Sequence, residues 1–189
     1  MGAPDPGTIA EALGRLARML AEWASPAAVI GGIAIVARVR PRLTTDIDLV
    51  IAVTPDRIGE LLSLARRHGW EHDPEETAEL AAGGLARLWG PPSPSEGVGL
   101  DLLFVDSPFL VSVVSRATPV SLGGAELPVA TVEDLLVMKL EAHRPEDLDD
   151  ILAIKDAFAE RLDLAYVRRN TDQLGISERL DLYFGSAAG

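Results

Sequence analysis

The chain of 189 residues contains no cysteine, and this absence excludes several kinds of site at once. Without cysteine there is no disulfide, no thiolate zinc site and no cysteine nucleophile. The three histidines, His68, His72 and His143, lack the spacing of metal ligands, so no zinc site is expected. A chain without cysteine agrees with a cytoplasmic location, which we expect.

Long apolar runs and lysines are also scarce. No run of about eighteen apolar residues occurs, so we expect no transmembrane helix and no membrane partner. The first seven residues lack the basic and apolar regions of a secretory signal. Only two of the seventeen basic residues are lysines, Lys139 and Lys155, so a lysine at a functional position is conspicuous.

Positive charge is in deficit overall, because 29 acidic residues outnumber 17 basic ones and give a formal charge of −12 at pH 7. This balance disfavours broad, unspecific nucleic-acid binding, which requires many basic side chains to neutralise phosphates. The overall charge does not exclude a local patch of basic side chains. The composition, 48% hydrophobic and 24% charged, is typical of a globular protein.

The apolar patterns predict an α/β (α+β) fold, a small mixed β-sheet flanked by helices, with a helical C-terminal portion. Helices are predicted at 8–24, 33–39, 55–69, 108–115, 131–140, 145–154, 163–173 and 177–184. Strands are predicted at 27–30, 47–53, 85–89, 98–105, 118–122 and 126–129. We interpret 71–82 and 90–97 as loops, and we divide the chain into a core, 1–130, and a helical portion, 131–189.

Two acids separated by one residue, Asp46 and Asp48, open an apolar strand. Because side chains alternate along a strand, both carboxylates point to one face, where they suit a hard divalent cation such as Mg²⁺ or Mn²⁺. Gly31 and Gly32 lie between a strand and a helix, where the backbone can approach a phosphate closely. A third acid, Asp101, lies in another buried strand, where an unpaired carboxylate would be costly. Taken alone, a pair of acids is more often solvated than metal-binding.

These elements, in this order, resemble the nucleotidyltransferase superfamily of the polymerase-beta type, and later segments resemble its AbiEii-type branch, which includes toxins of toxin–antitoxin pairs. The resemblance spans roughly residues 27 to 155. It departs from many members at Ile33, where they have serine, so the hydroxyl contact to the triphosphate is either missing or supplied by another residue such as Thr44 or Thr45. The segments that carry it are 29–34, 42–49, 100–103, 130–140 and 144–151.

The resemblance implies Mg²⁺-dependent transfer of a nucleoside monophosphate from a nucleoside triphosphate such as ATP to an acceptor hydroxyl. Two metals about 4 Å apart would stabilise the entering and leaving oxygens. Asp46, Asp48 and Asp101 would hold the metals, and Asp101 would accept the proton of the attacking hydroxyl. Lys139 would neutralise triphosphate charge; the alternative is a surface lysine.

The remaining nucleotide-binding candidates come from the same resemblance. They are Gly31, Gly32, Arg42, Thr45, Lys139, Asp147 and Asp150. Arg42 suits bidentate phosphate binding but could be an ordinary surface residue. Asp147 and Asp150 would orient Lys139 or Arg144, or contact the nucleotide; the alternative is an exposed acidic first turn favoured by the helix dipole.

The expected biological setting is a toxin with a cognate antitoxin, whose acceptor is RNA, tRNA in particular. An antibiotic nucleotidyltransferase of the aminoglycoside type is the first alternative, because the acidic charge suits a cationic acceptor. A non-catalytic binding protein that retains the fold is the second.

Overall fold

A six-stranded mixed sheet forms the centre of the computed structural model, which describes residues 6–91 and 97–186. The strand order is β3-β4-β2-β1-β6-β5. Neighbours pair antiparallel, except β2 with β4 and β1 with β6, which are parallel. The strands are β1 (Ala27–Ile30), β2 (Asp46–Ile51), β3 (Leu85–Trp89), β4 (Gly99–Phe104), β5 (Thr118–Leu122) and β6 (Ala125–Val129).

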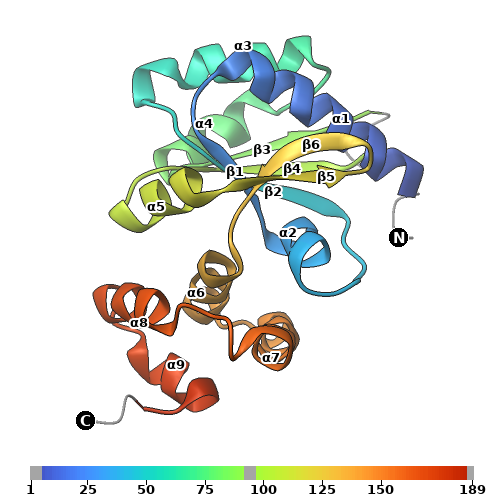
Figure 1. The fold of residues 1–189 in the computed structure, drawn as a ribbon. Coiled ribbons are helices and arrows are strands. Elements are labelled where there is room, and N and C mark those ends of the chain that lie inside the picture. Colours follow the sequence, from blue (N-terminus) through green and yellow to red (C-terminus); the bar gives the residue numbers. More distant parts are fainter. Residues whose placement is uncertain (1–5, 92–96, 187–189) are drawn as a thin grey trace.

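Helices cover both faces of this sheet. Figure 1 shows α1 and α3 on one side, and α2 with α6 to α9 on the other. The described helices are α1 (Pro6–Trp23), α2 (Gly31–Arg38), α3 (Ile58–Arg67), preceded by the 3-10 turn η1 (Pro55–Arg57), α4 (Pro74–Ala82), α5 (Pro108–Arg116), α6 (Val132–Ala142), α7 (Pro145–Phe158), α8 (Leu164–Gln173) and α9 (Ser177–Phe184). The α/β fold class with a helical C-terminal portion is confirmed.

Strand β2 shows how the fold positions polar groups. Its last three residues, Leu49, Val50 and Ile51, are fully buried, because helices cover both faces there. At the start of the strand the cover ends, and Asp46 is exposed while Asp48 is half-buried. The buried end therefore fixes the strand, and the open end carries the two carboxylates.

The C-terminal helices share the apolar core of the sheet. Leu135, Leu136 and Leu140 of α6 belong to the same buried cluster as the residues of β1 and β2. The division into 1–130 and 131–189 stays a prediction. Within the described ranges, no helix combines the length and apolar character that a membrane span requires.

The interpretation of 71–82 as a loop was wrong, since α4 occupies most of it. The Asp73 carboxylate accepts hydrogen bonds from the backbone N–H groups of Glu75 and Glu76, at 2.8 and 3.1 Å, and Pro74 occupies the first helical position. These are ordinary helix-start signals, which the many acidic residues obscured. Of the loop predicted at 90–97, residues 92–96 lie outside the described residues.

Candidate active site

A row of charged side chains crosses three neighbouring strands at one level. Asp48 of β2 lies directly opposite Asp101 of β4, which in turn lies opposite Arg87 of β3. Asp46, two residues before Asp48, lies opposite Gly99. Because side chains alternate along a strand, Asp46, Asp48, Asp101 and Arg87 share one face of the sheet.

This face forms one wall of a cleft of about 370 Å³. The cleft brings together most of the residues that the sequence predicted as a site. Its lining residues are Gly31, Gly32, Arg42, Leu43, Thr44, Thr45, Asp46, Asp48, Asp101, Lys139, Arg144 and Glu146. The sheet thus contributes three carboxylates to the cleft, and the cations Arg42, Lys139 and Arg144 come from outside the sheet.

Gly31 lets the first turn of α2 pack directly against Asp48. Its φ is +60°, and a Cβ atom added there would lie 2.0 Å from Oδ2 of Asp48. A Cβ atom on Gly32 would lie 2.5 Å from Oγ1 of Thr44. Both glycines are therefore needed for close approach, and α2 begins at Gly31, two residues earlier than predicted.

Gly31→Ala is expected to lower activity at least about tenfold, because a positive φ costs roughly 1–2 kcal/mol and the new methyl group displaces Asp48. Steady-state kinetics and thermal melting measure the two effects. Gly124→Ala is the matched control, since Gly124 has a φ of +84° and open space around its Cβ position. Equal activity of the two variants would show that the contact with Asp48 is unimportant.

Asp48 is held in a state that disfavours its negative charge. Burial raises the pKa of Asp48, and repulsion from Asp101 and Asp46 raises it further. A hydrogen bond from the Gly32 backbone N–H and the charge of Lys139 oppose this shift. A divalent cation would relieve the repulsion among the three carboxylates, so this donor set fits a hard metal ion.

The carboxylate of Asp101, which lines the same cleft, is engaged by an arginine. Both of its carboxylate oxygens accept hydrogen bonds from Arg87, from Nε and Nη2, each at 2.7 Å. Among the residues that the structure describes, no group of three His, Cys, Asp or Glu side chains is arranged to hold one metal ion. Asp101 therefore differs from Asp48, since both of its oxygens already bind a guanidinium group.

Lys139 of α6 lies in a buried ion-pair network at the opposite wall. Its side chain is only 9% exposed, and Nζ lies 2.6 Å from Oδ1 of Asp147 and 3.1 Å from Oδ2 of Asp150. Lys139 is therefore not an ordinary surface lysine, because its ammonium group is buried and paired with two carboxylates. The same side chain lines the cleft, as Asp48 does.

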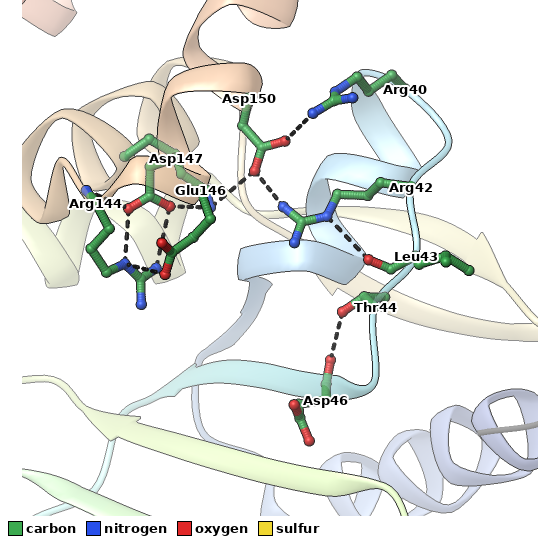
Figure 2. A network of polar contacts seen from close by, with 10 residues as sticks. Arg40, Arg42, Leu43, Thr44, Asp46, Arg144, Glu146, Asp147 and Asp150 are labelled. Atoms are coloured by element: carbon green, nitrogen blue, oxygen red, sulfur yellow. Dashed lines mark hydrogen bonds and ion pairs between the residues drawn. The ribbon is translucent and has the colours of Figure 1, made fainter. Parts of the chain in front are cut away.

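Asp150 forms ion pairs with two arginines as well as with Lys139. Figure 2 shows Arg40 and Arg42 reaching Asp150 from the segment after α2, with Arg40 Nη2 3.1 Å from Oδ1 and Arg42 Nη1 2.5 Å from Oδ2. The Asp150 side chain is fully buried. Asp150 therefore lies behind the cations, which favours an orienting role over direct contact with a nucleotide.

Asp147 orients Arg144 in the same way. Its Oδ2 accepts a hydrogen bond of 2.9 Å from Arg144 Nε, and its own side chain is fully buried (Figure 2). Burial raises the pKa of Asp147, but the hydrogen bonds from Arg144 and Lys139 outweigh it and bring the pKa to about 2. Asp147 is thus buried and ion-paired, and the alternative of an exposed acidic first turn does not hold for it.

The lowered pKa predicts how acid destabilises the fold. Ionised Asp147 contributes stability at pH values above its ordinary pKa of about 4, and this contribution is lost as the pH falls toward about 2. The melting temperatures of wild type and Asp147→Asn should therefore differ fully at neutral pH and converge between those values. A constant difference down to the lower pH would contradict the ion pair.

The two threonines lie beside Asp46. Thr45 Oγ1 donates to Oδ2 of Asp46 at 2.7 Å, and Thr44 Oγ1 donates to the Asp46 carbonyl at 3.3 Å. Thr44 also contacts Gly32, the residue before Ile33. Thr44 is therefore the threonine that packs against the glycine pair.

Two functional candidates, Arg40 and Arg87, were missed by sequence reasoning. Arg40 stands two residues before Arg42, and this spacing was the signal available for it. Arg87 gave no comparable signal, because its contact with Asp101 depends on how β3 and β4 pair.

The family profile described as "Nucleotidyl transferase AbiEii toxin, Type IV TA system" matches residues 14–184. The chain belongs to the AbiEii family. This AbiEii-family protein is accordingly a nucleotidyltransferase, and the alternative of a non-catalytic binding protein is not retained. A comparison with curated proteins gives no match.

Solved structures show the same fold at low sequence identity. An antigenic nucleotidyltransferase-like protein from Paracoccidioides brasiliensis is 19% identical, with 98% of this chain and 100% of that one covered and a TM-score of 0.58. JHP933 from Helicobacter pylori is 15% identical over 100% and 87%, with a TM-score of 0.55. ANT(2″)-Ia, solved with adenylyl-2″-tobramycin, is 16% identical over 86% and 98%, with a TM-score of 0.54.

Proposed function

We propose that this nucleotidyltransferase uses Mg²⁺ or Mn²⁺ as cofactor and transfers a nucleoside monophosphate to an acceptor hydroxyl. The hydroxyl attacks the α-phosphate of a nucleoside triphosphate such as ATP, and pyrophosphate leaves. One observation carries the proposal: Asp46, Asp48 and Asp101 meet at one wall of a cleft whose other wall holds Arg42 and Lys139. Carboxylates for metals and cations for phosphates are what this reaction requires.

The carboxylates of Asp46, Asp48 and, after release from Arg87, Asp101 would hold the metal ions. When bound, these ions neutralise charge on the entering and leaving oxygens. Arg42, Lys139 and Arg144 would bind the triphosphate, with Asp147 and Asp150 keeping them in place. Asp101 would accept the proton of the acceptor hydroxyl.

The biological role that we propose is a toxin controlled by a cognate antitoxin, as the description of the family suggests. For the acceptor we propose RNA, tRNA in particular. In the ion-pair network at this wall, four cations face the three carboxylates of Glu146, Asp147 and Asp150, which leaves an excess of one positive charge for phosphates.

A small cationic acceptor of the aminoglycoside type is the second candidate. A hollow lies beside the edge strand β3, lined by Glu71, His72, Asp73, Glu76 and Trp89, and its acidic side chains favour a cation. ANT(2″)-Ia, which was solved with an adenylylated aminoglycoside, shares the fold. The formal charge of −12 also favours a cationic acceptor.

Label transfer separates the two acceptors. The protein is incubated with α-labelled triphosphates, Mg²⁺ and either total tRNA or an aminoglycoside panel. Label on tRNA supports the first candidate, and Glu71→Gln/Glu76→Gln should leave it unchanged. Label on an aminoglycoside, reduced by that double variant, supports the second. Absence of label from both would contradict the two proposed acceptors.

Growth of a bacterial host tests the toxin role. Induction of the wild-type chain is expected to arrest growth, and Asp48→Asn, expressed to the same level, is expected to restore it. Arrest by both forms would mean that toxicity does not depend on nucleotidyl transfer.

A further inference from the structure

Arg87 forms an ion pair with Asp101, the third carboxylate beside Asp46 and Asp48. We propose that Arg87 is a positioning residue that holds Asp101 away from the metal site in the metal-free enzyme and yields it when a divalent cation binds. The proposal rests on the metal-dependent function above, and we call the Arg87–Asp101 pair the clamp.

The clamp engages Asp101 completely. The guanidinium approaches edge-on with two hydrogen bonds of 2.7 Å, one to each carboxylate oxygen. Such a bidentate pair is strong for its exposure and fixes the plane of the carboxylate. Both oxygens of Asp101 thus already accept a charged donor, so a cation bound with Asp46 and Asp48 would compete with Arg87 for this carboxylate.

Arg87 is free to move once Asp101 leaves. Strand β3 is at the edge of the sheet, and the Arg87 side chain is 41% exposed. Two other partners lie nearby: the Trp89 ring, whose centroid is 5.8 Å from Cζ, and the negative charges of Glu76 and Asp46. The guanidinium can therefore exchange one partner for another without being buried alone.

The clamp is not needed to pair the strands. β3 and β4 are joined in register over five residue pairs, from Leu85 with Leu103 to Trp89 with Gly99. On the opposite face of β3, Ala86 and Leu88 are fully buried. Strand pairing and apolar burial thus hold β3 in place, which leaves the charged face available for a functional contact.

Mn²⁺ affinity without nucleotide tests the clamp, with free Mn²⁺ measured by electron paramagnetic resonance. Arg87→Gln is expected to bind Mn²⁺ about fivefold tighter than wild type, the effect of removing one partly exposed ion pair. Arg87→Lys keeps the charge but loses the two-point contact, so it should bind about twofold tighter. In an Asp101→Asn background, the effect of Arg87→Gln should shrink below about twofold. Arg57→Gln, which removes another ion-paired arginine, is the matched control for charge and should bind as wild type does.

Thermal melting gives a second readout that a merely structural contact would not produce. Mn²⁺ should raise the melting temperature of Arg87→Gln more than that of wild type, because the cation no longer competes with the guanidinium. An equal rise in both proteins would contradict the clamp.

The remaining outcomes separate the clamp from the function on which it rests. If Asp48→Asn loses Mn²⁺ binding while both Arg87 variants bind as wild type does, the clamp is wrong and the metal site stands. If Arg87→Lys equals wild type and Arg87→Gln stays tighter in the Asp101→Asn background, long-range charge explains the effect and the clamp is again wrong. If wild type and Asp48→Asn bind Mn²⁺ equally, the proposed function fails and the clamp fails with it.

Discussion

Asp48→Asn is expected to reduce nucleotidyl transfer on the order of a thousandfold, yet to raise the melting temperature of the metal-free protein. The carboxamide cannot act as an anionic metal ligand, so the reaction loses charge stabilisation. The fold gains, because burial and repulsion from Asp101 and Asp46 raise the pKa of Asp48 and make its ionised form unfavourable. Relief of about 1 kcal/mol would raise the melting temperature by about 2–4 °C.

The opposite signs of the two effects make this prediction demanding. Label transfer and metal-free thermal melting are measured on the same preparation. Asp56→Asn serves as control, since Asp56 is an exposed acid in the turn η1 and both readouts should stay at wild-type values. A fall in melting temperature together with activity would mean that Asp48 supports the fold rather than the reaction.

Asp150→Asn is expected to cost about 3–5 kcal/mol of unfolding free energy and to weaken triphosphate binding strongly. Asp150 is fully buried and neutralises Arg40, Arg42 and Lys139 together. Without its charge, three cations repel one another in a partly buried place, and Arg42 and Lys139 lose the partner that aims them at the cleft. Denaturant unfolding and the KM for the triphosphate measure the two consequences.

Asp149→Asn is the matched control for this change. Asp149 is the neighbouring residue on α7, has the same chemistry and is exposed, so both measurements should remain within error of wild type. If Asp150→Asn unfolded at the wild-type denaturant concentration, the buried network would not hold the cations as the distances suggest.

Local signals were sufficient for much of the fold. Alternation and apolar runs predicted all six strands, because β-sheet burial has a period of two that short segments already display. The strand that carries Asp48 and the helix after the glycine pair were predicted too, although β2 begins one residue and α2 two residues earlier than predicted. The error at α4 arose where Asp73 and Pro74, good start signals, stood in a segment with little apolar periodicity.

The candidate site was readable in part for a similar reason. Asp46, Asp48, Asp101 and Lys139 stand in short motifs with a chemical logic of their own, and they line one cleft. Their roles stay predictions. Arg87 and Arg40 meet Asp101 and Asp150 only through strand register and helix packing, across 14 and 110 residues of chain, which no local pattern encodes.

The most direct test of the central claim compares two positions of the label. Wild type, Asp48→Asn and Asp56→Asn are incubated with Mg²⁺, an acceptor pool and triphosphates labelled on either the α- or the γ-phosphate, and EDTA replaces Mg²⁺ in parallel samples. The account predicts that α-label alone reaches the acceptor, only with Mg²⁺, and that Asp48→Asn abolishes the transfer while Asp56→Asn does not. Transfer of γ-label, or α-label transfer that survives Asp48→Asn, would contradict it.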